Sequence, residues 1–195
     1  MRSAKSERIT AETRIEIALS VDGTGRYSVE CPIGFLKHML ETFARHAGFD
    51  LEAKIAGDLS VDQHHTVEDA GRALGDVLRR ALGDKSGIRR AGSFLFPMDE
   101  SLARAAVDLS GRPFLKWDVK LRARKCGDLE TNVVEDFFAG FAEELGAGLH
   151  LKVFYGRSDH HKLEAVFKAA ARALREACAP DSQMSGVVPS TKEVL

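Results

Sequence analysis

Four of the seven histidines lie in two copies of one short pattern, His-His-x-x-Glu. The copies are His64-His65-x-x-Glu68 and, 96 residues later, His160-His161-x-x-Glu164. Imidazole with carboxylate suits manganese, iron or zinc, and the absence of thiolate disfavours a purely structural zinc site. Because successive helical residues turn by about 100°, adjacent histidines diverge too far to bind one small ion together. The duplicated pattern therefore predicts two metal ions.

Two further histidines could complete the ligand set. His38 lies near the start of a predicted helix, and His150 opens a predicted strand just before the second copy. Divided evenly, six imidazoles and two carboxylates give each ion four ligands, which leaves positions open for catalysis on an octahedral ion. His46 receives no role. The pattern is neither the His-Glu-x-x-His of zinc peptidases nor the Glu-x-x-His of di-iron helix bundles.

The elements that carry these residues are also duplicated. The apolar positions of the helix after His64, which ends near Leu82, recur 96 residues later, and this predicts two copies of one unit. Alternation and helical periodicity predict strands at 15–21 and 26–31, a helix from about 35, a strand at 49–55, then strands at 103–109 and 114–121, a helix over 134–141 and a strand at 149–155. Asp62 and Asp159 are placed to cap the two His-His-Glu helices.

Each half thus reads as strand-strand-helix-strand-helix, which predicts an α+β fold, a two-layer sandwich with helices on one face of each sheet. We place the first half at 1–88, the second at 89–179 and an irregular C-terminal arm at 180–195. A formal net charge of −1 gives no reason to expect nucleic acid as a partner, and no apolar run is long enough for a membrane span. The three scattered cysteines suit a reducing compartment, so we expect a cytoplasmic protein.

Seven stretches, spread over nearly the whole chain, resemble the imidazoleglycerol-phosphate dehydratase family of histidine biosynthesis. They are 34–40 (GFLKHML), 57–69 (GDLSVDQHHTVED), 82–90 (LGDKSGIRR), 97–100 (PMDE), 108–113 (DLSGRP), 159–169 (DHHKLEAVFKA) and 189–192 (PSTK). Together they are far more specific than any one of them. Four positions depart from the family's usual pattern, where Lys37 replaces Asp, Ala11 replaces Lys, Ser158 replaces Asn and Glu193 replaces Gly.

The resemblance implies a duplicated fold whose halves are like ribosomal protein S5 domain 2, and a homo-oligomer of 24 subunits with sites formed between subunits. It also implies two Mn²⁺ per active site, with Fe or Zn as substitutes. The matching ligands are His38, His64, His65, Glu68, His150, His160, His161 and Glu164. The matching substrate and phosphate-binding positions are Arg90, Arg112, Lys168, Ser190, Thr191 and Lys192. Cations and hydroxyls are what a phosphate dianion requires, and the set gives the C-terminal arm a role.

The implied activity is that of a hydro-lyase, the dehydration of D-erythro-imidazole glycerol phosphate to imidazole acetol phosphate. The proton that is lost sits on a carbon with no adjacent carbonyl, so we expect the metals to bind the imidazole ring as templates and Lewis acids. Glu12 matches the family's acid/base glutamate and is the candidate general base, and Asp99 is a weaker candidate for a supporting role. Two alternatives stay open. In the first, the protein is a divergent paralogue that acts on a related substrate, and in the second it is a non-catalytic shell protein assembled by metal.

Overall fold

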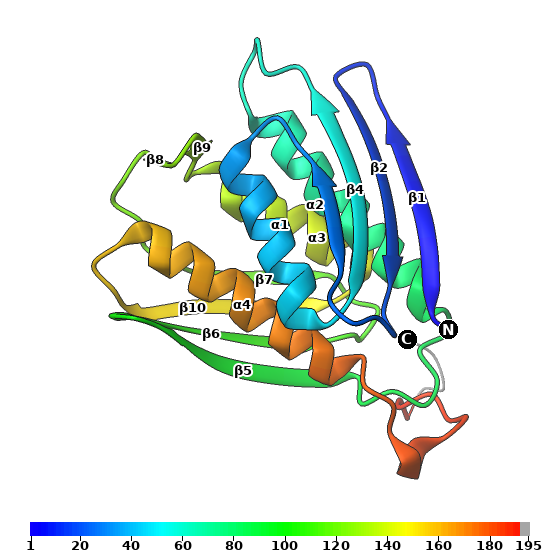
Figure 1. Cartoon of the computed structure of the whole chain (residues 1–195). Coiled ribbons are helices and arrows are strands. Elements are labelled where there is room, and N and C mark those ends of the chain that lie inside the picture. The colour runs from blue at the N-terminus through cyan, green and yellow to red at the C-terminus, as the bar shows by residue number, and fades with distance from the viewer. Residues whose placement is uncertain (192–195) are drawn as a thin grey trace.

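Both halves of the chain build a four-stranded sheet covered by two helices (Figure 1). The structure is a computed structural model and describes residues 1–191, so Lys192 and Glu193 lie outside the described residues. The first half contains β1 (Ser3–Ile9), β2 (Thr13–Ser20), β3 (Tyr27–Glu30), α1 (Gly34–Ala47), β4 (Asp50–Gly57) and α2 (His64–Leu82). The second contains β5 (Ala91–Met98), β6 (Ser101–Asp108), β7 (Phe114–Asp118), the hairpin β8 (Lys125–Cys126) and β9 (Leu129–Glu130), α3 (Val133–Leu145), β10 (Gly148–Tyr155) and α4 (Asp159–Ala177). A 3₁₀ turn, Ser182–Met184, follows in the arm.

The two sheets have the same topology. Their strand orders are β1-β2-β4-β3 and β5-β6-β10-β7, and in each the last-named pair is parallel while the others are antiparallel. The α+β fold and the internal duplication are therefore confirmed. The predicted unit was wrong by one strand, because each half begins with an edge strand, β1 or β5, that sequence periodicity did not predict. The strand predicted over 114–121 is also shorter and ends at Asp118.

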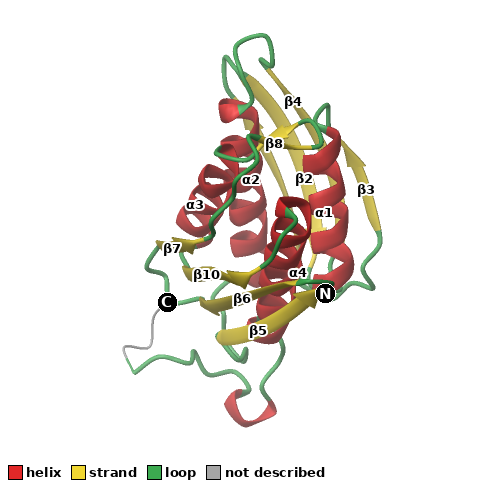
Figure 2. Cartoon of the chain, turned by 90° about the vertical axis from the view of Figure 1, so that its left-hand side faces the viewer, coloured by secondary structure: helices red, strands yellow, loops and turns green. Residues whose placement is uncertain are grey.

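The helices of the two halves meet between the sheets, as the two views show (Figures 1 and 2). Helix α2 packs along α3, and α1 packs along α4, so each pair joins one half to the other. Close approach of α2 and α3 needs glycine, because a methyl group at Gly71 would overlap the backbone of Phe137. Aromatic rings fill the space around these contacts, with Phe137 and Phe138 4.8–5.4 Å from Phe167 between ring centroids. The core therefore fixes the helices that carry the histidine motifs.

The starts of α2 and α4 differ in detail. The N-cap residue of α2 is Gln63, which makes no side-chain capping bond, but Asp62 Oδ1, one residue earlier, accepts the N–H of His64 at 2.8 Å. The prediction that Asp159 caps α4 was wrong, because Ser158 Oγ takes that place and accepts the N–H of His161. Asp159 instead accepts the N–H groups of the 122–123 loop and pairs with buried Lys162 at 2.6 Å. Serine at 158 therefore keeps a side-chain oxygen at the start of α4.

Candidate metal centre

The two histidines of each motif face different surroundings. The ring centroids of His64 and His65 are 5.9 Å apart with planes at 79°, and those of His160 and His161 are 5.8 Å apart at 84°. Both pairs occupy the first turn of a helix. Each motif therefore presents two separate imidazole positions, and each position has its own carboxylate partners.

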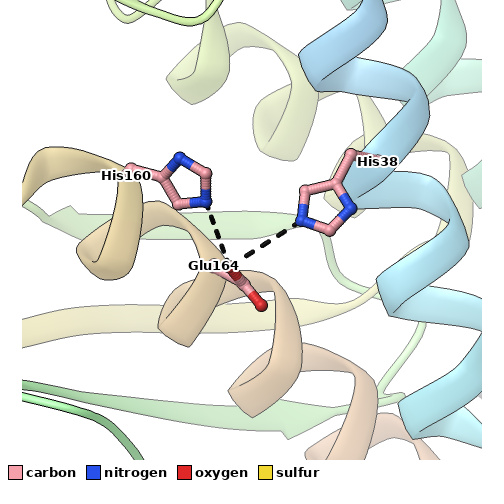
Figure 3. Close-up of side chains that lie close together, drawn as sticks. All are labelled: His38, His160 and Glu164. Carbon is pink, nitrogen blue, oxygen red and sulfur yellow. Dashed lines mark hydrogen bonds and ion pairs between the residues drawn. The ribbon is translucent and has the colours of Figure 1, made fainter.

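One group of predicted ligands converges between the halves. His38 on α1 and His160 on α4 point toward the same carboxylate oxygen of Glu164 (Figure 3). The Nε2 atom of His160 lies 3.2 Å from Glu164 Oε2, and that of His38 lies 3.8 Å from it. Three potential ligand atoms on two elements thus lie within 4.8 Å of one another, which is close enough to share a metal ion.

Charge keeps Glu164 available as an anion. Burial of Glu164 favours the neutral acid, but the Lys168 ammonium, 2.7 Å from Oε1, and then His38 and His160 together outweigh burial, so the pKa of this carboxyl is lowered. The edge of Phe35 contacts His160, with ring centroids 4.9 Å apart. The carboxylate is thus ionised and partly shielded from water, as a metal ligand must be.

A related group lies where α2 packs along α3, as the first group lies where α1 packs along α4. We call these two places the helix junctions. His64 Nε2 is 3.4 Å from Glu68 Oε2, and His64 Nδ1 is 3.4 Å from Asp136 Oδ2 on α3. Arg72 Nη2 bonds the second oxygen of Glu68 at 2.9 Å. The motif offset places Arg72 opposite Lys168, and aligning the ends of α1 and α3 at Gly48 and Gly146 places Asp136 opposite His38.

Sequence reasoning missed Asp136 because it used only the offset of 96, and it missed Arg72 although that offset relates Arg72 to the predicted Lys168. The α1 and α3 helices differ in offset by two residues from the motif helices. Extending the repeat alignment helix by helix would have found both positions. The two helix junctions are therefore related by the duplication, but one contributes a second histidine, His38, where the other contributes Asp136.

The second histidine of each motif, His65 or His161, is contacted by carboxylates at Nδ1. We call these two the outer histidines. His65 Nδ1 lies 3.2 Å from Asp58 Oδ2 and 3.5 Å from Glu12 Oε2, and His161 Nδ1 lies 2.7 Å from Glu100 Oε2. These contacts fix each ring and leave Nε2 as the atom that can bind a metal, an arrangement common in metal sites.

The same carboxylates set the protonation of these rings. The hydrogen bond that His65 donates to Asp58 raises the pKa of His65, and the one that His161 donates to Glu100 raises the pKa of His161. In return, His161 and then the backbone N–H of Ser158 lower the pKa of Glu100 to about 2. Asp58 and Glu100 were not predicted from the sequence, although both lie within the matched stretches 57–69 and 97–100.

The candidate acid/base residues lie beside these outer rings. Glu12, in the β1–β2 turn, is the second carboxylate at His65, and Asp99 Oδ2 lies 3.7 Å from His161 Nε2. Asp99 has a positive φ of 47° in the tight turn between β5 and β6, and its side chain is 70% exposed. Both carboxylates are therefore accessible and lie next to a predicted metal ligand.

His150 lies apart from the other predicted ligands in this chain. It alternates with buried Leu149 and Leu151 on β10, so it faces away from the helices. Its ring stacks near Phe114, with centroids 5.6 Å apart, and it lines a shallow hollow with Arg112 and Asp108. One copy of the chain does not bring His150 to the helix junctions.

The predicted phosphate-binding residues are also divided. Arg90 pairs with both oxygens of Asp108 at 2.7 and 3.1 Å and donates to Pro189 O in the arm, next in sequence to half-buried Ser190 and exposed Thr191. Lys168 instead contacts Met98 at the opposite end of β5. At about 3.3 Å per residue, the strand separates Lys168 from Arg90 by roughly 25 Å, so one chain does not gather these cations.

Comparison with known proteins shows the family to which this chain belongs. The family model for imidazoleglycerol-phosphate dehydratase matches residues 31–174. Full-length relatives bearing that name are 56% identical in Koribacter versatilis (strain Ellin345) and 52% identical in Paracoccus denitrificans (strain Pd 1222), each over 195 residues and all of both chains. The chain belongs to the imidazoleglycerol-phosphate dehydratase family. It is therefore a dehydratase of histidine biosynthesis, a hydro-lyase that acts on a small phosphorylated imidazole.

Solved structures agree with this assignment of the imidazoleglycerol-phosphate dehydratase fold. The crystal structure of the enzyme from Staphylococcus aureus subsp. aureus N315 matches with a TM-score of 0.82 and 35% identity, over 91% of this chain and 99% of that one. The enzyme from Pyrococcus furiosus, in complex with (S)-C348, matches with a TM-score of 0.84 and 33% identity, over 97% and 100% of the chains. Within residues 1–191, no helix is long and apolar enough to cross a membrane.

One departure from the family's usual residues is accommodated locally in this dehydratase. Lys37, one residue before His38, lies 4.0 Å from Glu41 Oε1 on the same helix and is nearly half exposed. Its charge is therefore partly balanced by Glu41 and screened by water. Ala11 occupies an exposed position in the β1–β2 turn.

Proposed function

We propose that this protein is the manganese-dependent enzyme that converts D-erythro-imidazole glycerol phosphate to imidazole acetol phosphate, acting in the cytoplasm. The observation that carries the proposal is the convergence of His38, His160 and Glu164 from two halves of the chain. It accompanies full-length identity of 56% to a relative that bears the family's name. Imidazole and carboxylate donors without thiolate suit Mn²⁺, with Fe or Zn as substitutes.

Two ions per site would be held by the eight predicted ligands. These are His38, His64, His65, Glu68, His150, His160, His161 and Glu164. When bound, the ions supply Lewis acidity and a template for the imidazole ring. The carboxylates at Nδ1 of His65 and His161 orient both rings so that Nε2 faces outward.

Assembly is needed to complete such a site. His150 faces away from the helix junctions, and Arg90 and Arg112 lie far from Lys168 within one chain. A homo-oligomer that places the outer sheet face of one copy against the helix junctions of another would bring these groups together. We therefore propose sites between subunits, in a shell of 24 copies as the family resemblance implies.

The protein's own groups then have separate tasks. Arg90, Arg112, Lys168, Ser190 and Lys192 bind the phosphate and fix the substrate's orientation, which removes much of the entropic cost of reaction. Glu12 takes the proton from carbon, because its carboxylate is accessible and adjoins the ring of a metal ligand. Asp99 occupies the corresponding place beside His161 and supports proton transfer there.

The test is turnover of the purified protein with Mn²⁺ and imidazole glycerol phosphate, detected as the enolisable ketone. We expect Glu12→Gln to lower kcat by about a hundredfold or more with manganese content unchanged. Glu7→Gln is the control, because Glu7 is an exposed carboxylate of the same hairpin that pairs only with Arg14 in the described residues. Unchanged turnover in Glu12→Gln would remove the assignment of the base.

The same experiment separates the two alternatives. Metal-dependent assembly without product from the intended substrate would favour the non-catalytic shell. Water elimination from another imidazole or phosphorylated compound, with none from imidazole glycerol phosphate, would favour the divergent paralogue.

A further inference from the structure

The turn that carries Glu12 is tied to helix α2 by a chain of hydrogen bonds. Thr10 Oγ1 accepts the backbone N–H of Glu12 at 3.1 Å and that of Thr13 at 2.9 Å. The hydroxyls of Thr10 and Thr13 are 3.1 Å apart, and Thr13 Oγ1 donates to Asp69 Oδ2 on α2 at 2.6 Å. The chain therefore runs from the backbone of Glu12 to a carboxylate of the helix.

The hydroxyl protons of Thr10 and Thr13 can be arranged in only one consistent way along these hydrogen bonds. A carboxylate only accepts, so the single proton of Thr13 goes to Asp69. Thr10 must then donate to Thr13, and its oxygen lone pairs receive the two backbone N–H groups. All bonds point toward Asp69, and hydrogen bonds aligned in this way polarise and strengthen one another.

Asp69 also holds the other strand of the same hairpin. Its Oδ1 accepts from Arg8 Nε on β1 at 2.7 Å, whereas Thr13 belongs to β2. The Asp69 side chain is 10% exposed and that of Arg8 is 37% exposed, so the inner end of the pair is shielded from water. One carboxylate thus fixes both sides of the turn that contains Glu12.

The location of Asp69 gives this chain a role at the proposed site. Asp69 lies one helical turn after His65, whose ring is 3.5 Å from the Glu12 carboxylate. The Glu12 side chain is 51% exposed, so little packing restrains it and its place depends on the backbone of the turn. Helix α2 thus sets both the ring and the position of the carboxylate beside it.

We propose that Asp69, acting through Thr13 and Thr10, is a positioning residue that holds Glu12 beside His65. The proposal rests on the proposed function in taking Glu12 as the base. In this role the three hydrogen-bonded side chains do not contact the substrate. They act by limiting the positions that the Glu12 carboxylate can take.

A matched bond elsewhere on α2 provides the control. Ser6 Oγ on β1 donates to Asp76 Oδ2 at 2.7 Å, which is again a buried hydroxyl bonded to an α2 carboxylate. It lies about two helical turns from Asp69, and within residues 1–191 neither Ser6 nor Asp76 forms a hydrogen bond or ion pair with a predicted site residue. Ser6→Ala therefore removes a similar sheet-to-helix bond without affecting the Glu12 turn.

The experiment compares Thr13→Val, Thr13→Ser and Ser6→Ala in the assembled manganese enzyme. Valine keeps the shape of threonine and removes the hydroxyl, whereas serine keeps the hydroxyl. We expect Thr13→Val to lower kcat by about tenfold or more, with KM changed by less than about twofold, because small misplacements of a reacting group are costly. Manganese content should not change. Thr13→Ser and Ser6→Ala should retain wild-type kcat, and a loss of kcat in Ser6→Ala equal to that in Thr13→Val would overturn the proposal.

A second measurement does not depend on catalysis. Thr10 is exposed, so Thr10→Val should not prevent folding. We expect this variant to speed deuterium uptake in the peptide spanning 8–14, because two N–H groups lose their acceptor, while Ser6→Ala leaves uptake there unchanged. Unchanged uptake in Thr10→Val would overturn the proposal that these hydrogen bonds hold the turn. A wild-type protein without turnover would overturn the proposed function, but deuterium uptake would still show whether the hydrogen bonds hold the turn.

Discussion

Replacing Gly71 by alanine tests the packing that joins the two halves. Gly71 lies on α2 where that helix crosses α3. In an unhindered helix the substitution stabilises by about 1 kcal/mol, because alanine is the better helix former. Here the added methyl group would lie 2.8 Å from the carbonyl carbon of Phe137 and closer still to its oxygen.

The size of the effect follows from that overlap. Carbon atoms meet favourably at about 3.5 Å or more, so the two helices would have to separate by about 1 Å. Overpacking of this kind costs about 1–3 kcal/mol, and separated helices also lose contacts among the aromatic rings. We expect a net loss of about 2 kcal/mol, which lowers the Tm of a chain of this size by about 4–8 °C. The same movement shifts Asp136, which precedes Phe137, away from His64.

Thermal unfolding at one fixed protein concentration measures this loss. Gly148→Ala is the control, because a methyl group there would have as its nearest neighbour Asp108 O at 4.0 Å, so we expect an unchanged Tm. The reasoning would be refuted if Gly71→Ala unfolded at or above the wild-type temperature.

Three other predictions concern charge and metal. In the metal-free protein, the Glu100–His161 pair is fully charged between the ordinary pKa values of 4.5 and 6.5. The contribution of this pair to Tm should fall as pH rises through the raised pKa of His161, or as pH drops from 4.5 toward about 2. Glu100→Gln should abolish this dependence of Tm on pH. If the variant and the wild type showed the same profile of Tm against pH, the prediction would be disproved. Asp159→Ala should cost about 3 kcal/mol in urea unfolding, because the buried ammonium of Lys162 loses its carboxylate and keeps only the carbonyl of Lys120 as a partner in the described residues. A loss below about 1 kcal/mol would contradict that reason. Mn²⁺ at about a hundred times its Kd should add about 2.7 kcal/mol to the free energy of unfolding. His160→Ala should greatly reduce this gain, and His46→Ala should not. Equal gains in the two variants would exclude His160 as a ligand.

Most elements could be predicted because their buried faces are strongly apolar. β2 alternates buried Ile15, Ile17 and Leu19 with less buried neighbours, and α2 and α4 repeat their apolar positions at a constant offset. β1 escaped prediction because it is a sheet edge whose only buried residue is Ser6. β5 is also an edge strand, and none of its residues is fully buried, although it carries Phe94 and Phe96. β1 and β5 are recognised by their backbone pairing with β2 and β6, and pairing is not visible in sequence.

The chemical types of the site were determined by the sequence alone. The repeated His-His-x-x-Glu pattern, the lack of nearby thiolate and the seven matched stretches indicated a family and a ligand class without any coordinates, because ligand chemistry depends on side-chain type and local spacing. Which groups meet was decided only by the tertiary structure. It joined His38 to Glu164 across more than a hundred residues, added Asp58, Glu100 and Asp136 as ring partners, and placed His150 on the opposite side of its sheet. These contacts depend on how two helix layers pack, and that packing is the collective result of the whole core rather than of any local segment.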